Sequence, residues 1–143
     1  MTIAETDRVE IIELHHRYYL PTGDKDVDGF MDCWVEDSFE DFFSPFGDFE
    51  DREGLRTFEH DHTHGGTADG KRHFSGKLVL RKGDDEDTVL ATSYITVVDV
   101  VNAPRIVATG KYTDSVVRRT ADGWNLVRRE LSVDPGFKKL QDS

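Results

Sequence analysis

The spacing of apolar residues changes at His73, and that change constrains the fold more than any other feature of the chain. Before His73 apolar residues recur at helical intervals, and after it they follow a period of two. The second half therefore predicts four long strands, at residues 72–82, 88–101, 105–119 and 124–133. The breaks between them carry the Gly, Asp, Asn and Pro residues that are typical of tight hairpins.

The first helix is predicted for residues 2–20. Thr2 and Glu5 stand three positions apart, which fits a capping box at its start. Pro21, followed closely by a glycine, is expected to end it, because proline lacks the N–H that continues a helix.

Two shorter helices and a short strand are predicted before His73. Asp26 is placed to cap a helix over residues 27–35, and a third helix is expected to begin near Asp51. Between them, residues 39–43 predict a strand and residues 44–48 a turn.

This order, helices first and then a meander, indicates an α+β fold with the N-terminal helices packed on a strongly curved antiparallel sheet. Strands of this length must twist and coil. A coiled sheet closed by helices forms a cone-shaped α+β barrel with a cavity at its wide end. The 143 residues suit a single domain over 1–143.

Charge and composition argue against several kinds of partner. The net charge is −11 and the isoelectric point is about 4.9, so nucleic acids and anionic membrane surfaces are poor partners. Residues 1–5 lack the apolar core of a signal peptide, and no apolar run is long enough to span a membrane. With Cys33 as its single cysteine, the chain has no internal disulfide. We therefore expect a cytoplasmic protein.

His73 and Asp24 are the first candidates for chemistry. An imidazole titrates near neutral pH and suits general acid–base work. Asp26 is the better helix cap, which leaves Asp24 available for another role. A carboxylate that is hydrogen-bonded to a histidine fixes its tautomer and makes it a stronger base. Spacing alone leaves open whether the two meet; a surface or core histidine and a turn aspartate are the alternatives.

Tyr19 and Arg129 are the second pair of candidates. A tyrosine hydroxyl in the last turn of the first helix could donate to an oxyanion or a leaving hydroxyl, with core packing as the alternative. Strict alternation puts Arg129 on the strand face opposite Trp124 and Leu126. An arginine on an apolar face is costly unless it is paired, so Arg129 could bind a substrate oxygen or the aspartate. A surface ion pair with Glu130 is the alternative.

Three histidines at alternate positions, His60, His62 and His64, form a rival site. In a strand they could ligate zinc or iron. The segment instead predicts a helix end, where this spacing does not converge, and we expect no metal there.

Several short stretches, taken in order, fit a known family. They are residues 11–19, 24–30, 34–37, 70–74, 112–114 and 122–124. With them the chain resembles the SnoaL-like branch of the nuclear transport factor 2-like superfamily over nearly its whole length. This fold hosts many functions, so the resemblance specifies the fold better than the activity.

Within that branch the chain is most similar to the Asp–His dehydratases and dehydrochlorinases of the scytalone dehydratase, bile acid 7α-dehydratase and hexachlorocyclohexane dehydrochlorinase type. The resemblance implies a dyad of Asp24 and His73 and a last-strand arginine at Arg129. Tyr19 matches a tyrosine of the bile acid enzyme, where the dehydrochlorinase has lysine. The resemblance therefore implies elimination of a hydroxyl group rather than a halide.

The implied activity is that of a cofactor-independent lyase or isomerase in which His73 removes a carbon-bound proton from a small, cyclic substrate. No metal or organic cofactor is implied, and a homo-oligomer is expected, a trimer rather than a dimer. A non-catalytic small-molecule-binding or assembly module, related to the small subunits of ring-hydroxylating dioxygenases, is the alternative. The resemblance implies an apolar substrate pocket formed by Phe30, Trp34, Phe39, Phe42, Tyr94 and Tyr112.

Overall fold

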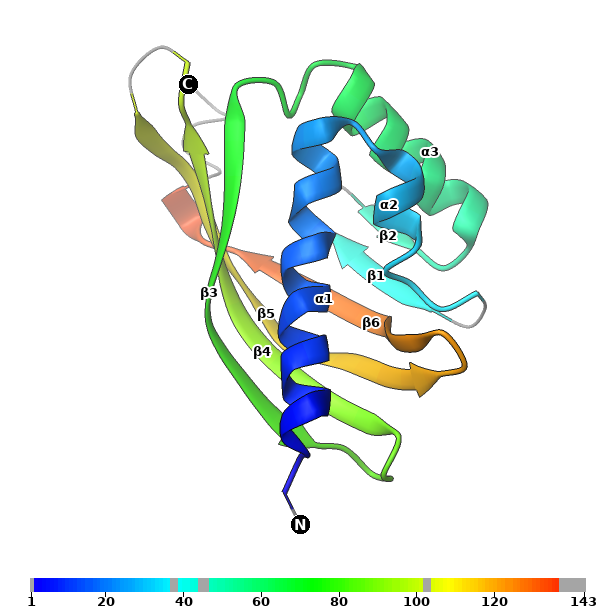
Figure 1. The fold of residues 1–143 in the computed structure, drawn as a ribbon. Coiled ribbons are helices and arrows are strands. Elements are labelled where there is room, and N and C mark those ends of the chain that lie inside the picture. The colour runs from blue at the N-terminus through cyan, green and yellow to red at the C-terminus, as the bar shows by residue number, and fades with distance from the viewer. Residues whose placement is uncertain (1, 37–38, 44–46, 102–103, 137–143) are drawn as a thin grey trace.

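A long helix lies in the curl of a six-stranded sheet in the computed structural model, which describes residues 2–36, 39–43, 47–101 and 104–136 (Figure 1). The sheet order is β2-β1-β6-β5-β4-β3. The elements are α1 (Glu5–Asp24), α2 (Val27–Met31), β1 (Glu40–Phe43), β2 (Gly47–Phe49), α3 (Arg52–His64), β3 (Lys71–Lys82), β4 (Thr88–Asp99), β5 (Arg105–Thr120) and β6 (Gly123–Val133).

The predicted meander is confirmed, and β3 to β6 pair antiparallel in chain order. Register shifts interrupt each pairing, and such irregularities bend the strands and increase their twist. They let the sheet curl around α1 (Figure 1). The fold is therefore α+β, with the helices on the concave face, as the sequence predicts.

The sheet is not wholly antiparallel, because β1 pairs parallel with β6 at its edge. The strand predicted for residues 39–43 is confirmed as β1, but the turn predicted for residues 44–48 is partly wrong. Its end belongs to β2, which is too short to show a period of its own. Residues 44–46 lie outside the described residues.

Both predicted ends of α1 are wrong. Its first turn has Ala4 as the N-cap residue and no side-chain cap bond, so the capping box does not form. The helix also continues through Pro21, whose ring is buried, and apolar burial offsets the lost helical hydrogen bond. It ends at Asp24, and the C-cap residue Lys25 has a φ of 58° and donates its backbone N–H to the carbonyl of Pro21. The helix is therefore about one turn longer than predicted, and this added turn carries Thr22 and Asp24.

The predicted cap of α2 and the predicted start of α3 are confirmed. Asp26 accepts a hydrogen bond from the N–H of Gly29 at 3.0 Å, and Asp51 accepts one from Gly54 at 2.7 Å. However, α2 ends at Met31 and not at Val35. The chain leaves the helix there because the backbone on both sides of Trp34 is hydrogen-bonded to Leu126 of β6.

The core lies between α1, α2 and the concave face of the sheet. Tyr18 is at its centre, with ring centroids 5.0 Å from Phe30, 6.2 Å from Trp34 and 6.5 Å from Tyr112. No helix formed by the described residues has the length and apolar character needed to cross a membrane.

Candidate active site

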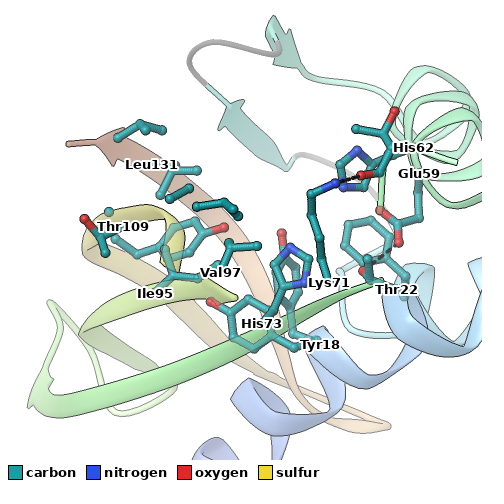
Figure 2. A pocket seen from close by; sticks show the side chains of 18 of the residues that line it. Tyr18, Thr22, Glu59, His62, Lys71, His73, Ile95, Val97, Thr109 and Leu131 are labelled. Carbon is teal, nitrogen blue, oxygen red and sulfur yellow. Dashed lines mark hydrogen bonds between the residues drawn. The ribbon is translucent and has the colours of Figure 1, made fainter. Parts of the chain in front are cut away.

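A cavity of about 280 Å³ lies between the concave face of the sheet, the end of α1 and α3 (Figure 2). This volume is close to the lower end of the range for small-molecule sites, roughly 300–1,000 Å³. Its walls are mostly apolar. It is lined by Tyr18, Tyr19, Thr22, Phe30, Phe58, Glu59, His62, Thr67, Lys71, His73, Ile95, Val97, Val107, Ala108, Thr109, Gly110, Tyr112, Leu131 and Val133.

The cavity has a polar side and an apolar side. Figure 2 shows Thr22, Glu59 and His62 together on the helical side, and Ile95, Val97 and Leu131 on the strands opposite. The side chain of His73 lies between the two groups. A ligand in the cavity would therefore meet apolar walls and a few ionisable groups, which is the usual composition of an enzyme site.

His73, on β3, is an ionisable residue of the cavity wall that could act as a base. Its imidazole is half-buried and stacks on the ring of Tyr19, with centroids 6.2 Å apart and planes at 10°. Burial, with smaller contributions from nearby His62 and Lys71, lowers the pKa of His73 to about 4. The ring is therefore neutral at pH 7 and can accept a proton.

Asp24 lies at the exposed end of α1, away from the cavity lining. It shares with His73 a separate outer groove, which Leu20 and Phe74 also line. His73 thus borders both the cavity and this groove. Among the described residues, no hydrogen bond or ion pair joins Asp24 to His73, and the Asp24 carboxylate is not among the groups that shift the pKa of His73. The dyad stays a prediction.

Tyr19 and Arg129 lie at the wall of the cavity and behind it. Tyr19 is 9% exposed, and burial raises its pKa, although Arg129 acts in the opposite direction. Arg129 is completely buried, with Cζ 4.5 Å from the ring centroid of Tyr18 and 3.6 Å from that of Tyr112. Tyr19 is among the described residues that line the cavity, whereas Arg129 is not.

The predicted facing of β6 is wrong at one point. Trp124 and Leu126 are buried on the same side as Arg129, and not on the opposite side. One extra residue, Val127, is inserted where β6 pairs with β5, so the alternation changes phase before Arg129. The neighbouring Arg128 instead lies 3.4 Å from the carboxylate of Glu130.

Two of the six predicted aromatic pocket residues, Phe30 and Tyr112, line the cavity. Trp34 and Phe39 pack against each other in the core, with centroids 5.3 Å apart. Tyr94 is 44% exposed. Its neighbour in β4, Ile95, lines the cavity, so the side chain of Tyr94 is on the other face of the sheet. The sixth residue, Phe42, belongs to β1, and its side chain lies outside the described part of the structure.

Glu59 is a site residue that the sequence predictions missed. It is 3% exposed, lines the cavity, and accepts a hydrogen bond from the hydroxyl of Thr22 at 2.8 Å. Burial raises the pKa of Glu59 to about 7, and the Thr22 bond opposes part of that shift. A signal was present in the sequence: Leu55, Glu59 and Thr63 stand four positions apart on one buried stripe of α3.

The three histidines of the rival site lie on α3, where alternate positions diverge. His60 and His64 stack on each other with centroids 4.5 Å apart, and both are exposed. His62 faces the cavity and stacks on Phe58 at 5.5 Å. Within the described residues, no group of three or more His, Cys, Asp or Glu side chains is arranged to hold a metal ion.

Solved structures show how widely this fold is shared. A protein of unknown function with a cystatin-like fold from Nostoc punctiforme has a TM-score of 0.80 and 24% identity, with 94% of this chain and 96% of that one covered. A nuclear transport factor 2-like protein from Novosphingobium aromaticivorans has a TM-score of 0.77 and 26% identity, with coverage of 94% and 88%.

A third structure, assigned as a scytalone dehydratase from Novosphingobium aromaticivorans, has a TM-score of 0.73 and 16% identity, with coverage of 90% and 85%. At that identity the likeness shows the fold alone. Curated proteins gave no significant match. The sequence model of the SnoaL-like domain matches residues 5–130, and this chain therefore belongs to the SnoaL-like domain family.

Proposed function

We propose that this protein is a cofactor-independent lyase or isomerase of dehydratase type, in which His73 removes a carbon-bound proton from a small cyclic substrate. The observation that carries the proposal is the neutral imidazole of His73 at the wall of an otherwise mostly apolar cavity. A histidine that is unprotonated at pH 7 and borders a mostly apolar site is available as a general base. A structural neighbour assigned as a scytalone dehydratase agrees with this reaction class.

The walls of the cavity suit a flat, ring-bearing molecule. Phe30 and Tyr112 offer aromatic surface, and Ile95 and Val97 of β4 offer aliphatic surface opposite the polar side. In the proposed reaction the Tyr19 hydroxyl stabilises the oxygen that gains negative charge. Arg129 acts from behind the wall, because its positive charge favours the anionic form of Tyr19 and of any oxyanion beside it.

Asp24 is included in the proposal as the partner of His73. Both residues line the outer groove, so the carboxylate could accept a hydrogen bond from the ring N–H that faces away from the substrate. Such a bond would hold the ring in one tautomer and raise its pKa above the low value that burial imposes.

Asp24→Asn is therefore expected to slow turnover by about tenfold or more, a part of the roughly 10²–10⁴-fold that general base catalysis supplies. The acid limb of the pH–rate profile should also move to lower pH, because the neutral amide no longer favours the imidazolium. Asp122→Asn, at the exposed hairpin before β6, is the matched control. If the Asp24→Asn variant matched wild type in rate and profile, the aspartate would have no part in the reaction.

The test of the function uses α-tetralone and its β-hydroxy derivative, a bicyclic ketone that yields α-naphthol on loss of water. Wild-type protein should exchange the α-protons of α-tetralone in heavy water and form α-naphthol from the hydroxy compound. Ala108→Phe, which fills the cavity from β5, should abolish both reactions while circular dichroism shows an intact fold. Binding of α-tetralone without exchange or elimination would contradict the proposal and favour a non-catalytic binding module.

A further inference from the structure

Glu59 is a buried carboxyl group in the wall of the same cavity, and the proposed base chemistry leaves it without a role. It lies on α3, is 3% exposed, and is shown next to Thr22 on the polar side of the cavity (Figure 2). A carboxyl group is almost never fully buried unless it is paired or functional. No ion pair within the described residues involves Glu59, so a structural salt bridge does not account for its burial there.

The hydrogen bonds around Glu59 fix its position and the place of its proton. The Thr22 hydroxyl donates to Oε1 at 2.8 Å, and the Thr63 hydroxyl donates to the Glu59 backbone carbonyl at 2.8 Å. Because Oε1 already accepts a hydrogen atom, the proton of a neutral carboxyl belongs on Oε2. Burial raises the pKa of Glu59 to about 7, so the protonated form is well populated at neutral pH.

Other ionisable groups line the cavity around Glu59, on α1, α3 and β3. His62 stands one turn further along α3, and His73 enters from β3; burial lowers the pKa of both. Lys71, also on β3, donates from Nζ to the carbonyl of Thr67 at 2.6 Å. Tyr19 on α1 has a raised pKa and keeps its proton. At neutral pH the cavity thus holds a neutral base, His73, and a carboxyl group, Glu59, whose protonated form is well populated.

We propose that Glu59 is the general acid of the elimination, a role that rests on the proposed function. His73 takes the carbon-bound proton, and the electron pair of that C–H bond forms the new double bond. The C–O bond breaks, and the departing oxygen takes the Oε2 proton of Glu59 and leaves as water. Glu59 ends as a carboxylate and His73 as an imidazolium, and proton transfer from His73 to Glu59 through water restores both. Two groups whose environments favour opposite protonation states are the usual basis for such a division of labour.

Glu59→Gln separates this role from the rest of the reaction. Glutamine keeps the size of the side chain and an oxygen for the Thr22 hydrogen bond, but it has no acidic proton to give. Elimination from β-hydroxytetralone should fall relative to α-proton exchange of α-tetralone by about 10²-fold, within the usual range for acid catalysis. Glu53→Gln, exposed in the first turn of α3, is the matched control, and circular dichroism checks the fold.

The outcomes distinguish failure of this inference from failure of the proposed function. If the Glu59→Gln variant eliminates water at the wild-type rate, Glu59 is not the acid, while wild-type exchange still supports His73 as the base. If exchange falls as much as elimination, Glu59 acts on binding or folding, and the inference is overturned. If wild-type protein neither exchanges nor eliminates, the proposed function fails and the inference fails with it.

The pH–rate profile gives a second, independent test. Elimination should decrease as pH rises through the pKa of Glu59, about 7, because only the protonated carboxyl can donate. The Thr22 hydrogen bond lowers that pKa, so Thr22→Val should move the alkaline limb of the profile to higher pH. A purely structural role would leave this limb unchanged. An alkaline limb that persists in Glu59→Gln, or stays in place in Thr22→Val, would overturn the inference.

Discussion

His73→Ala is expected to slow α-proton exchange and elimination together by roughly 10²–10⁴-fold, the contribution of a general base. Removing the imidazole leaves the cavity without the neutral nitrogen that receives the proton. His62 does not replace it in this scheme, because its ring is stacked on Phe58 at another part of the cavity wall. Initial rates with α-tetralone and β-hydroxytetralone measure the effect. His60→Ala, on the exposed side of α3, is the matched control.

The pH dependence of the wild-type rate adds a signature of the same residue. A base must be unprotonated, and the pKa of His73 is lowered to about 4. The Asp24 bond of the proposal raises this pKa, so the rate should hold down to mildly acidic pH and decrease as pH falls through a value above about 4, with the acid limb absent from the residual activity of His73→Ala. Full turnover by the purified His73→Ala variant would remove the base from the mechanism and the basis of the proposed function.

Arg129→Ala is expected to have the largest effect on stability, a decrease of about 3–5 kcal/mol in the free energy of unfolding. Arg129 is among the largest fully buried side chains, and its guanidinium lies against the rings of Tyr18 and Tyr112. Alanine would leave a void between these rings and remove cation–π contacts that are worth up to about 2 kcal/mol when desolvated. Urea unfolding, with the m-value compared between variants, measures the change.

Two variants test the cause of this loss. Arg129→Lys keeps the charge but replaces the planar group that stacks on Tyr112, so it should lose stability, though less than alanine does. Arg128→Ala, at the half-exposed neighbouring position, should stay within about 0.5 kcal/mol of wild type. An Arg129→Ala variant as stable as wild type would show that the two aromatic rings do not depend on the guanidinium.

Much of the fold could be predicted from local pattern, because a period of two that continues over ten or more residues is typical of strands and incompatible with a helix. All four long strands begin within one residue of their predicted positions, and β4 ends two residues early, at Asp99. The edge of the sheet was harder to predict, because β2 is only three residues long. The end of α1 was mispredicted because the helical penalty of Pro21 is local, whereas the burial that offsets it depends on the tertiary fold.

The site was less predictable than the fold, because a residue lines a cavity only if its side chain is on the concave face of the sheet. A β-bulge changes which residues of a strand are on that face. One extra residue in β6 turned Arg129 to the same side as Leu126. In β4, Ile95 faces the cavity and Tyr94 does not. Glu59 could have been predicted as a site residue from the sequence. It stands four positions after Leu55, so it places a charged side chain on the same face of the helix as that apolar residue. Whether Asp24 meets His73 depends on how α1 ends, which spacing cannot specify.

The added turn at the end of α1 has a consequence for how this protein could change its substrate. Tyr19, Thr22 and Asp24 all belong to that one helix end, so inserting a residue before it would rotate the three together by about 100°. The aliphatic wall opposite is contributed by separate strands. Substitutions at Ile95, Val97 or Ala108 can therefore reshape the space for a substrate while the proton-transfer groups keep their places. Selection for new ligands should act on β4 and β5 first, and laboratory libraries are best directed there.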